Sequence, residues 1–340
     1  MLNLQQRLDL LKQLKQYILS DDIQWAFAKR TASQQNAWFT EEFIDDAVQN
    51  IVNCFLNEEK LAQWISHYKL PEQNTSPVNV GITMAGNIPL VGFHDFLCTF
   101  ITGNQQTIKL SAKDSVLLKY LTDKLVEWNG TAAAFIQYKE ILKGCDAYIA
   151  TGSNNSARYF EYYFKKYPNI IRRNRTSVAI ITGKETYEEL LALSDDVYMY
   201  FGLGCRNVTK IYVPQHYDFI PLLEAFKKYD RVIENHKYKH NYDYHLAMHI
   251  INQKFYMTNG SIVLVEDNPV FSPISELHYQ FYSNKDEIYQ SLNPEEIQCI
   301  AGNEKTPFGS TQQPQLNDYA DGIDTMHFLL SIQNKSAVEN

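Results

Sequence analysis

The sequence has few cysteines and no pair of them in a CxxC spacing. The five cysteines stand far apart, at positions 54, 98, 145, 205 and 299. An odd number of widely spaced cysteines argues against a disulfide framework and fits a reducing compartment. Long apolar runs are also absent. No segment approaches the roughly 20 consecutive apolar residues of a membrane span, and residues 1–18 mix charged and amide side chains into their leucines, unlike a signal peptide. We therefore expect a protein of the cytoplasm without a membrane span.

An excess of positive charge and several catalytic motifs are missing as well. The formal net charge of -8 argues against a nucleic-acid partner held by neutralising its phosphates. No Gly-x-Ser-x-Gly segment is present to begin a Ser/His/Asp triad. Four histidines form two i, i+4 pairs, at His236, His240, His245 and His249, but no HExxH motif or nearby cysteine accompanies them. We predict no metal site and leave the role of these histidines open.

The composition is that of a folded globular protein, because 45% of the 340 residues are hydrophobic and 21% are charged. Apolar residues recur at helical spacing from residue 2 to about residue 70, which predicts amphipathic helices. Beyond a break rich in Pro, Asn and Ser, short strands alternate with helices. The expected strands are 78–83, 106–110, 147–151 and 177–182, and the expected helices are 93–101, 115–128 and 156–167. Such alternation predicts a parallel sheet that binds ligands at the carboxyl ends of its strands.

A second α/β group follows, and it contains a cysteine preceded by two glycines. In the segment Tyr200-Phe201-Gly202-Leu203-Gly204-Cys205-Arg206-Asn207, the glycines allow a sharp turn and a close approach of the backbone to a ligand. A thiol placed beside its own backbone N–H in such a turn is suited to act as a nucleophile. Free cysteines are more often small buried hydrophobic residues. The segment by itself leaves both interpretations open.

Several segments resemble, in the same order, those of the aldehyde dehydrogenase superfamily. They are Ala85-Gly86-Asn87-Ile88-Pro89-Leu90, Gly103-Asn104 with Thr107 to Ser111, Thr151-Gly152-Ser153, the segment around Cys205, and Thr306-Pro307-Phe308-Gly309. Together they span roughly residues 78–310, and a chance match rarely keeps such an order. Within the superfamily the chain is most similar to the bacterial luminescence-type acyl-CoA reductases, which share Gly-Leu-Gly-Cys-Arg-Asn-Val and the tyrosine-rich segment at 241–244. No motif places the first 70 residues.

The resemblance implies an α/β fold of the aldehyde-dehydrogenase type, with two Rossmann-like lobes and an N-terminal helical segment. The expected parts are helices at 1–75 packed on the cofactor lobe, a dinucleotide-binding α/β lobe at 76–184, a catalytic α/β lobe at 185–305, and a tail at 306–340 that returns to the core or to an oligomer interface. Because the superfamily is usually oligomeric, the resemblance also implies a homo-oligomer.

By the same resemblance, Cys205 is the catalytic nucleophile. The side-chain amide of Asn87 and the backbone N–H of Cys205 would form the oxyanion hole, and each such donor typically contributes about 3 kcal/mol. Ordinary turn chemistry is the alternative explanation for Asn87. Arg206 is a candidate cation beside the thiolate and a candidate substrate contact. A surface ion pair is its alternative role.

The general base of the aldehyde-oxidising members is missing. Those members carry a Glu-Leu-Gly-Gly-Lys segment upstream of the nucleophile, where this chain has Arg172-Arg173-Asn174-Arg175-Thr176. Arg172 stands at the Glu position. Without that carboxylate, attack by water is poorly assisted and an acyl-enzyme should persist. Arg172 could instead bind a phosphate of an acyl-CoA or acyl-carrier-protein thioester, or belong to a solvated basic loop.

The resemblance further implies a nicotinamide cofactor. Its expected contacts are Lys109 and Ser111 at the adenosine ribose, Gly152 and Ser153 near the pyrophosphate, and Glu276 at the nicotinamide ribose. Each of these residues also has an ordinary alternative role, as a solvated lysine, a tight turn or a surface glutamate.

The residues after Lys109 favour one of the two nicotinamide cofactors. NAD-preferring members often place Glu three residues after that lysine, where this chain has Ala112, followed by Lys113. An absent anion and an added cation favour a 2'-phosphate, so we expect NADPH.

These observations predict that the protein reduces a fatty acyl thioester, carried by CoA or by an acyl carrier protein, to an aldehyde with NADPH. The intermediate would be an S-acyl group on Cys205. Two alternatives stay open. One is a CoA-acylating aldehyde dehydrogenase that works in the oxidative direction, and the other is a non-catalytic binding or scaffold protein that retains the fold.

Overall fold

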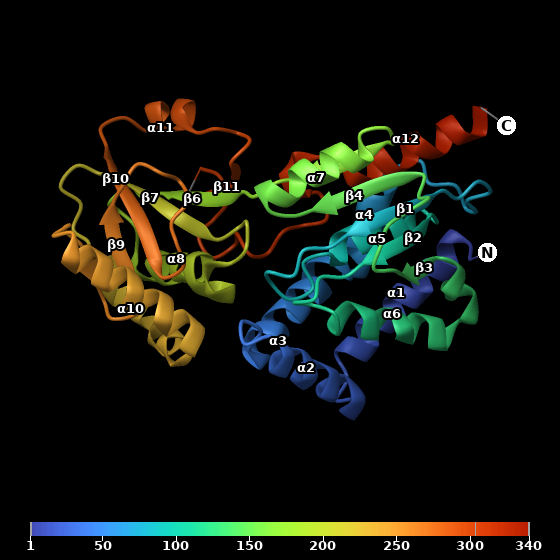
Figure 1. Ribbon diagram of the computed structural model, residues 1–340, viewed down its shortest axis with the longest axis horizontal. Helices are drawn as coiled ribbons and strands as arrows, with labels where there is room; N and C mark the ends of the chain where they lie inside the picture. Colours follow the sequence, from blue (N-terminus) through green and yellow to red (C-terminus); the bar gives the residue numbers. More distant parts are fainter. Residues whose placement is uncertain (1, 303, 339–340) are drawn as a thin grey trace. The chain divides into compact units, whose positions relative to one another are not determined.

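The computed structural model describes residues 2–302 and 304–338, with side chains described as far as Gln333. Its contacts divide the chain into two units. Unit 1 comprises Met1–Asn174 and Gln315–Asn340, and unit 2 comprises Arg175–Pro314. Each unit contains a β-sheet accompanied by helices (Figure 1), which confirms the α/β fold class expected from the sequence.

The N-terminal part of unit 1 is helical. Its elements are α1 (Leu4–Ile18), α2 (Ile23–Gln35), α3 (Glu41–Asn50), a π-helix at Ile51–Phe55 and α4 (Glu58–Ser66). Each α-helix begins beside a capping side chain that accepts a hydrogen bond from the backbone N–H three residues further on. The capping residues are Asn3, Asp22, Thr40 and Asn57. The apolar faces of these helices lie in the core of unit 1, as their periodicity predicts.

The sheet of unit 1 is parallel, with the strand order β3-β2-β1-β4-β5. Its strands are β1 (Asn79–Thr83), β2 (Gln105–Lys109), β3 (Ile136–Tyr138), β4 (Ala147–Thr151) and β5 (Asn169–Arg172). The connecting α-helices are α5 (Phe93–Ile101), α6 (Leu117–Trp128) and α7 (Asn154–Phe164). The chain runs outward from β1 to β3 and then returns to the other side of β1 with β4. Open α/β sheets bind ligands at the carboxyl ends of the strands where the order reverses in this way.

The C-terminal segment belongs to unit 1. The helix α12 (Thr325–Val338) packs against α5. Its residues Met326, Leu329 and Ile332 are buried in the same hydrophobic core as the α5 residues Phe96 and Phe100. The chain therefore begins and ends in the same unit.

Unit 2 contains a second sheet, with the strand order β11-β6-β7-β10-β9-β8. Its strands are β6 (Thr176–Ile180), β7 (Val208–Pro214), β8 (Met257–Thr258), β9 (Val263–Glu266), β10 (Glu276–Tyr282) and β11 (Ile297–Ala301). Neighbouring strands run parallel except for β8 and β9. The α-helices of this unit are α8 (Tyr187–Tyr198), α9 (Ile220–Ala225), α10 (His236–Ile251) and α11 (Lys285–Ser291).

The division between the units differs from the boundary expected at residue 184. Unit 2 begins at Arg175, because β6 pairs with β7 and β11 rather than with the sheet of unit 1. The apolar pattern of 177–182 identifies a strand, but a strand's own residues do not specify which of two similar sheets it joins. The strand expected at 177–182, at the end of the cofactor lobe, therefore belongs to the unit that contains Cys205.

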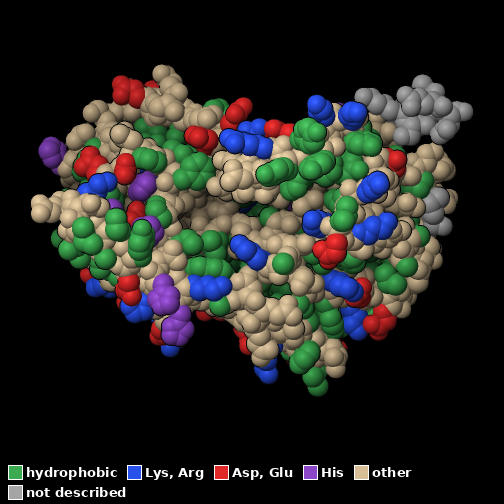
Figure 2. All heavy atoms as spheres, in the orientation of Figure 1, with side chains coloured by type: hydrophobic (Ala, Val, Ile, Leu, Met, Phe, Trp, Pro, Cys, Tyr) green, Lys and Arg blue, Asp and Glu red, His purple; other side chains and the backbone are tan. Residues whose placement is uncertain are grey.

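Acidic and basic side chains are interspersed on the face of the protein seen in Figure 2. No helix within residues 2–302 and 304–338 is both long enough and apolar enough to cross a membrane.

Candidate active site

The expected cofactor residues of unit 1 gather at one edge of its sheet. Thr83 of β1 is in register with Lys109 of β2 and Ala150 of β4, so the three parallel strands end together. The strand ends and the loops that follow them carry the expected cofactor residues and the expected oxyanion donor: Lys109, Ser111 and Lys113 at β2, Gly152 and Ser153 after β4, and Asn87 after β1. The topology therefore brings six predicted site residues to the carboxyl edge of one sheet.

The loops after β1 and β2 contact each other closely. A Cβ atom on Gly86 would lie 2.6 Å from Cβ and Oγ of Ser111, so a larger residue does not fit there. Ser111 Oγ accepts a hydrogen bond from the backbone N–H of Lys113 at 3.2 Å. Asp114 Oδ2 accepts one from the backbone N–H of Leu90 at 2.8 Å. The loop that carries Asn87 is thus held against the expected ribose-binding residues.

Asp114 is buried beside these loops, and burial raises its pKa to about 6. Its Oδ1 has no hydrogen-bond partner among the described residues. The ordinary pKa of an aspartate is about 3.9, so this carboxyl contributes stability that is fully present below about pH 4 and is lost as the pH rises through its folded pKa.

Replacing Asp114 with Asn retains an oxygen acceptor for Leu90 and removes the charge. We expect D114N to match the wild type in stability near pH 4 and to exceed it near pH 8 by an amount on the order of 2 kcal/mol. Thermal unfolding followed by circular dichroism at both pH values measures the difference. A gain of equal size at the two pH values would contradict the assigned titration.

The turn after β4 is packed closely against the start of α7. A Cβ on Gly152 would lie 2.9 Å from Cβ of Ser156 and 3.0 Å from Cε2 of Phe160, so glycine is required by packing against α7. Ser153 caps α7, because its Oγ accepts a hydrogen bond from the backbone N–H of Ser156 at 3.3 Å. The free N–H groups and the dipole at a helix start favour a phosphate. This turn fits the expected pyrophosphate position.

Arg172 has a different position from the one expected of a substrate contact. It is the last residue of β5, and only 4% of it is exposed. Its guanidinium makes a two-pronged ion pair with Asp95 of α5, at 2.6 and 2.9 Å, and donates to Thr325 Oγ1 at 3.0 Å. The prediction that Arg172 binds substrate is therefore corrected: the side chain is held inside unit 1. The neighbouring basic residues suggested a solvated loop, but strand alternation turns Arg172 inward.

The chain before Cys205 makes a left-handed turn. The helix α8 ends at Tyr198, and Tyr200, Phe201 and Gly202 then have φ values of 54°, 57° and 74°. A left-handed conformation costs roughly 1–2 kcal/mol for a residue with a side chain. Burial of Tyr200 and Phe201, which are 4% and 3% exposed, offsets this cost. Strained backbone of this kind is concentrated at functional sites.

Asn207 holds the turn that presents Cys205. It is fully buried, and its Nδ2 lies 3.1, 3.3 and 2.9 Å from the carbonyl oxygens of Asp196, Val197 and Met199. Its Oδ1 accepts a hydrogen bond from the backbone N–H of Gly204 at 2.8 Å. The backbone N–H of Asn207 also donates to the Gly204 carbonyl at 3.1 Å, which closes a four-residue turn with Cys205 and Arg206 at its centre.

The Asp196 carboxylate joins this turn to the Pro-Phe-Gly segment. The buried carboxylate accepts hydrogen bonds from the backbone N–H of Gly309 at 2.7 Å and from the backbone N–H and Oγ1 of Thr311 at 3.0 and 2.7 Å. Burial raises the pKa of Asp196 to about 6. The segments at 200–207 and 306–309, both singled out by resemblance, are therefore parts of one structure in unit 2.

Cys205 is half-buried, whereas Cys54, Cys98 and Cys145 are buried. Cys299 is the other half-buried thiol, and Cys205 and the half-buried Arg206 both lie close enough to influence its titration. Cys205 therefore lies at the centre of a held turn and is not one of the fully buried cysteines.

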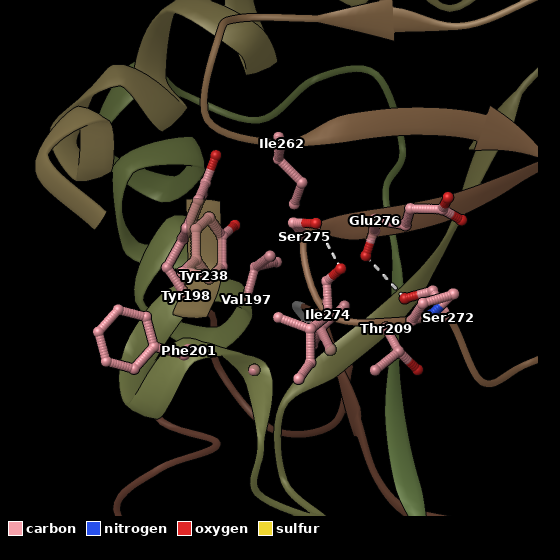
Figure 3. A pocket seen from close by; sticks show the side chains of 13 residues that line it. Val197, Tyr198, Phe201, Thr209, Tyr238, Ile262, Ser272, Ile274, Ser275 and Glu276 are labelled. Carbon is pink, nitrogen blue, oxygen red and sulfur yellow. Dashed lines mark hydrogen bonds between the residues drawn. The ribbon is translucent and has the colours of Figure 1, made fainter. Parts of the chain in front are cut away.

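A small pocket lies beside this turn in unit 2 (Figure 3). Tyr198, Phe201 and Tyr238 line one side, and Ile274 and Ser275 line the opposite side. The rings of Phe201 and Tyr238 are 5.7 Å apart, so the left-handed turn itself supplies part of the pocket wall.

Glu276 lies near this pocket, but its carboxylate points away from the aromatic rings (Figure 3). Its Oε1 is 2.8 Å from His249 Nε2 and 3.2 Å from His245 Nδ1, and its Oε2 is 3.7 Å from His278 Nε2. Burial alone would raise the pKa of Glu276, but hydrogen bonds from His278 and His249 outweigh it and lower the pKa. The structure adds histidine partners to the Glu276 carboxylate, and its expected contact with the nicotinamide ribose stays a prediction.

The histidines of α10 fall into two groups. His245 and His249 face Glu276, whereas His236 and His240 are exposed, and histidine side chains are visible over α10 in Figure 2. Across the part of the chain that the structure describes, no three His, Cys, Asp or Glu residues are arranged to hold a metal ion.

A profile of the family described as acyl-CoA reductase (LuxC) matches residues 25–235, which are more than half of the chain and include Cys205. No curated protein matches the chain in sequence.

Solved aldehyde dehydrogenases share the fold. Aldehyde dehydrogenase 21 from Physcomitrella patens, in complex with the reaction product succinate, has a TM-score of 0.69 and 11% identity, covering 96% of this chain and 84% of that one. The Mycobacterium tuberculosis aldehyde dehydrogenase complexed with NAD+ has a TM-score of 0.63 and 14% identity, covering 85% and 70%. The NAD+ complex of the Bacillus cereus enzyme has a TM-score of 0.62 and 14% identity, covering 84% and 69%. The fold is that of the aldehyde dehydrogenases, and the chain belongs to the acyl-CoA reductase (LuxC) family, whose members are oxidoreductases that act on acyl or aldehyde groups.

Proposed function

We propose that the protein reduces a fatty acyl thioester to an aldehyde with NADPH through an S-acyl group on Cys205. The observation that carries this proposal is the held turn at 204–207, which presents a half-buried thiol within the matched residues 25–235. A strained backbone, a buried Asn207 and a buried Asp196 all support one thiol position. Such preorganisation is what a nucleophile requires.

The reaction begins when the Cys205 thiolate attacks the thioester carbonyl carbon. The backbone N–H of Cys205 would stabilise the charge on the carbonyl oxygen. The role of Asn87 as a second donor stays a prediction. The bond to the thiol of CoA or of the carrier protein then breaks, and that thiol leaves with a proton. After reduction of the acyl carbon, the bond to Cys205 Sγ breaks, the aldehyde leaves and the thiolate is restored.

The residues at the carboxyl edge of the unit 1 sheet suit a dinucleotide, because lysine and serine side chains and the start of α7 come together where the parallel strands end. Lys109, Ser111 and Lys113 would hold the adenosine ribose and its 2'-phosphate, and the turn before α7 would hold the pyrophosphate. NADPH, when bound, supplies a hydride to the acyl carbon. Two of the structurally similar aldehyde dehydrogenases are complexes with NAD+, which supports a nicotinamide cofactor here.

The reductive direction is supported by Arg172. This residue stands where aldehyde-oxidising members carry their general base, and it is buried in an ion pair with Asp95. An arginine in this state cannot activate water, so the acyl group on Cys205 should persist until it is reduced.

Two further expectations stay predictions: that the protein forms a homo-oligomer, and that an acyl carrier protein can serve as the acyl donor.

The direct test is the loss of NADPH absorbance when the protein is mixed with acyl-CoA substrates of increasing chain length. We expect loss of absorbance together with an equal amount of aldehyde, and a dependence on chain length. Reduction of NADP+ with aldehyde and CoA, without the forward reaction, would favour the oxidative alternative. No turnover in either direction would favour a binding or scaffold protein.

The cofactor preference makes a separate prediction. Ala112 is exposed beside Lys113 and Ser111, and a glutamate there would repel the 2'-phosphate and accept hydrogen bonds from the ribose hydroxyls of NADH. We expect Ala112→Glu to change the ratio of kcat/KM for NADPH over NADH by about tenfold or more in favour of NADH. Ser115→Glu is a matched control, because it adds the same charge at an exposed position in the same loop. Equal ratios in the two variants would remove the argument for NADPH.

A further inference from the structure

Ser177 lies where both neighbouring strands of the unit 2 sheet are irregular. On one side, β11 contains an extra residue between Ile297 and Ile300 relative to β6. On the other side, β7 contains an extra residue between Val208 and Lys210, opposite Ser177 and Val178. Bulges of this kind redirect side chains and are over-represented next to active sites. Two of them meet at one residue of β6.

The Ser177 hydroxyl connects the Cys205 peptide to Cys299. Ser177 Oγ donates a hydrogen bond to the Cys205 carbonyl oxygen at 3.1 Å. The same Oγ lies 2.9 Å from Cys299 Sγ and accepts a hydrogen bond from the Cys299 backbone N–H at 3.2 Å. A serine hydroxyl has one hydrogen, which is used on Cys205. The thiol hydrogen of Cys299 must therefore point to Ser177 Oγ.

The surroundings keep Cys299 in the protonated form that this contact requires. Ser177 is fully buried, and burial raises the pKa of the Cys299 thiol, although the Arg206 cation acts in the opposite direction. Cys299 is thus a hydrogen-bond donor and not a second thiolate. With two donors from Cys299 and one hydrogen given to Cys205, the Ser177 hydroxyl has all its hydrogen-bonding capacity used.

We propose that Ser177 and Cys299 are positioning residues for the nucleophile: the Cys299 thiol orients the Ser177 hydroxyl, and that hydroxyl fixes the Cys205 carbonyl. Fixing this carbonyl restrains ψ of Cys205 and so holds the peptide plane between Cys205 and Arg206 against the Cα atom that carries the thiol. This inference rests on the proposed role of Cys205. It assigns a task to a second cysteine that the reaction itself does not use.

The test measures the reactivity of Cys205 in Ser177→Ala, Cys299→Ala and Cys299→Ser. Two rates are followed: alkylation of Cys205 by iodoacetamide as a function of pH, and acylation by an acyl-CoA in a single turnover. Because a 1 Å displacement of a catalytic group can cost about 100-fold, we expect both rates to fall about tenfold or more in S177A and C299A. We also expect the midpoint of the alkylation profile to change in S177A and C299A, because the pKa of a thiol depends on the groups that surround it.

The Cys299→Ser variant distinguishes positioning from packing. It retains an O–H donor for Ser177, so it should react nearly as the wild type does, while C299A does not. Wild-type rates and pH profiles in both alanine variants would overturn the inference. If S177A does not fold, the comparison of C299S with C299A still tests the inference. Equal alkylation and acylation rates in these two variants would overturn it. Failure of the proposed function gives a different result, in which wild-type Cys205 is alkylated but never acylated.

Discussion

Cys205→Ala should abolish thioester reduction, with a loss on the order of 1,000-fold or more in kcat. The reason is that no other thiol is presented in the same way. Cys54, Cys98 and Cys145 are buried, and Cys299 Sγ lies in hydrogen-bond contact with Ser177 Oγ at 2.9 Å. NADPH binding should be unchanged, because its expected contacts lie in unit 1. The decrease in NADPH absorbance measures turnover, and quenching of protein fluorescence measures binding.

The matched control for this prediction is Cys145→Ala, which removes a buried thiol from unit 1. That variant should retain turnover with at most a modest change in stability. Residual turnover in C205A comparable to that of C145A would mean that another residue forms the covalent intermediate. Loss of NADPH binding in C205A would mean that Cys205 is needed for cofactor binding as well as for thioester chemistry, contrary to the proposal.

Asp95→Ala should destabilise unit 1 strongly, by about 3–5 kcal/mol. The substitution leaves the Arg172 guanidinium buried, with a hydrogen bond to Thr325 Oγ1. Arg172 Nε already lacks a hydrogen-bond partner among the described residues. Burying an unpaired charge lowers the free energy of unfolding strongly. The net contribution of the intact ion pair to stability is smaller than the loss measured when one partner is removed. Urea unfolding followed by circular dichroism gives the free energy of unfolding.

Two comparisons make the Asp95 prediction specific. Asp123→Ala removes the exposed ion pair with Lys119 and should cost no more than about 1 kcal/mol. Adding Arg172→Leu to Asp95→Ala should recover much of the lost stability, because the buried charge is then gone. A loss in D95A no larger than that in D123A would contradict the assignment of a buried ion pair.

The alternation of strands and helices predicted the parallel sheet of unit 1, because period-2 and period-3.6 patterns are local properties of a chain. Parallel strands then fix which loops share an edge, which is why the sequence predicts Lys109 and Gly152 at the same edge of the sheet. The turn at Cys205 was also indicated locally, by Gly202 and Gly204. The left-handed φ of Tyr200 and Phe201 was not indicated, since tertiary burial overrides their preference.

The contacts that local patterns do not predict join residues distant in sequence. Arg172 is predicted to bind substrate, but it pairs with Asp95, which is 77 residues away on α5. Glu276 is predicted at the cofactor, and the structure adds His249, which is 27 residues away on α10, as a partner of its carboxylate. Side-chain pairing across elements depends on the packing of the whole unit, so the spacing of residues along the chain does not predict it. Asp196 and Asn207 were missed as supports of the nucleophile for the same reason.

Intact-protein mass spectrometry after mixing with an acyl-CoA tests the central claim most directly. The account predicts one acyl group per chain, located on Cys205 by peptide mapping, absent from C205A, and removed on addition of NADPH with release of aldehyde. An unmodified Cys205, an acyl group on another residue, or an adduct that NADPH leaves in place would contradict it.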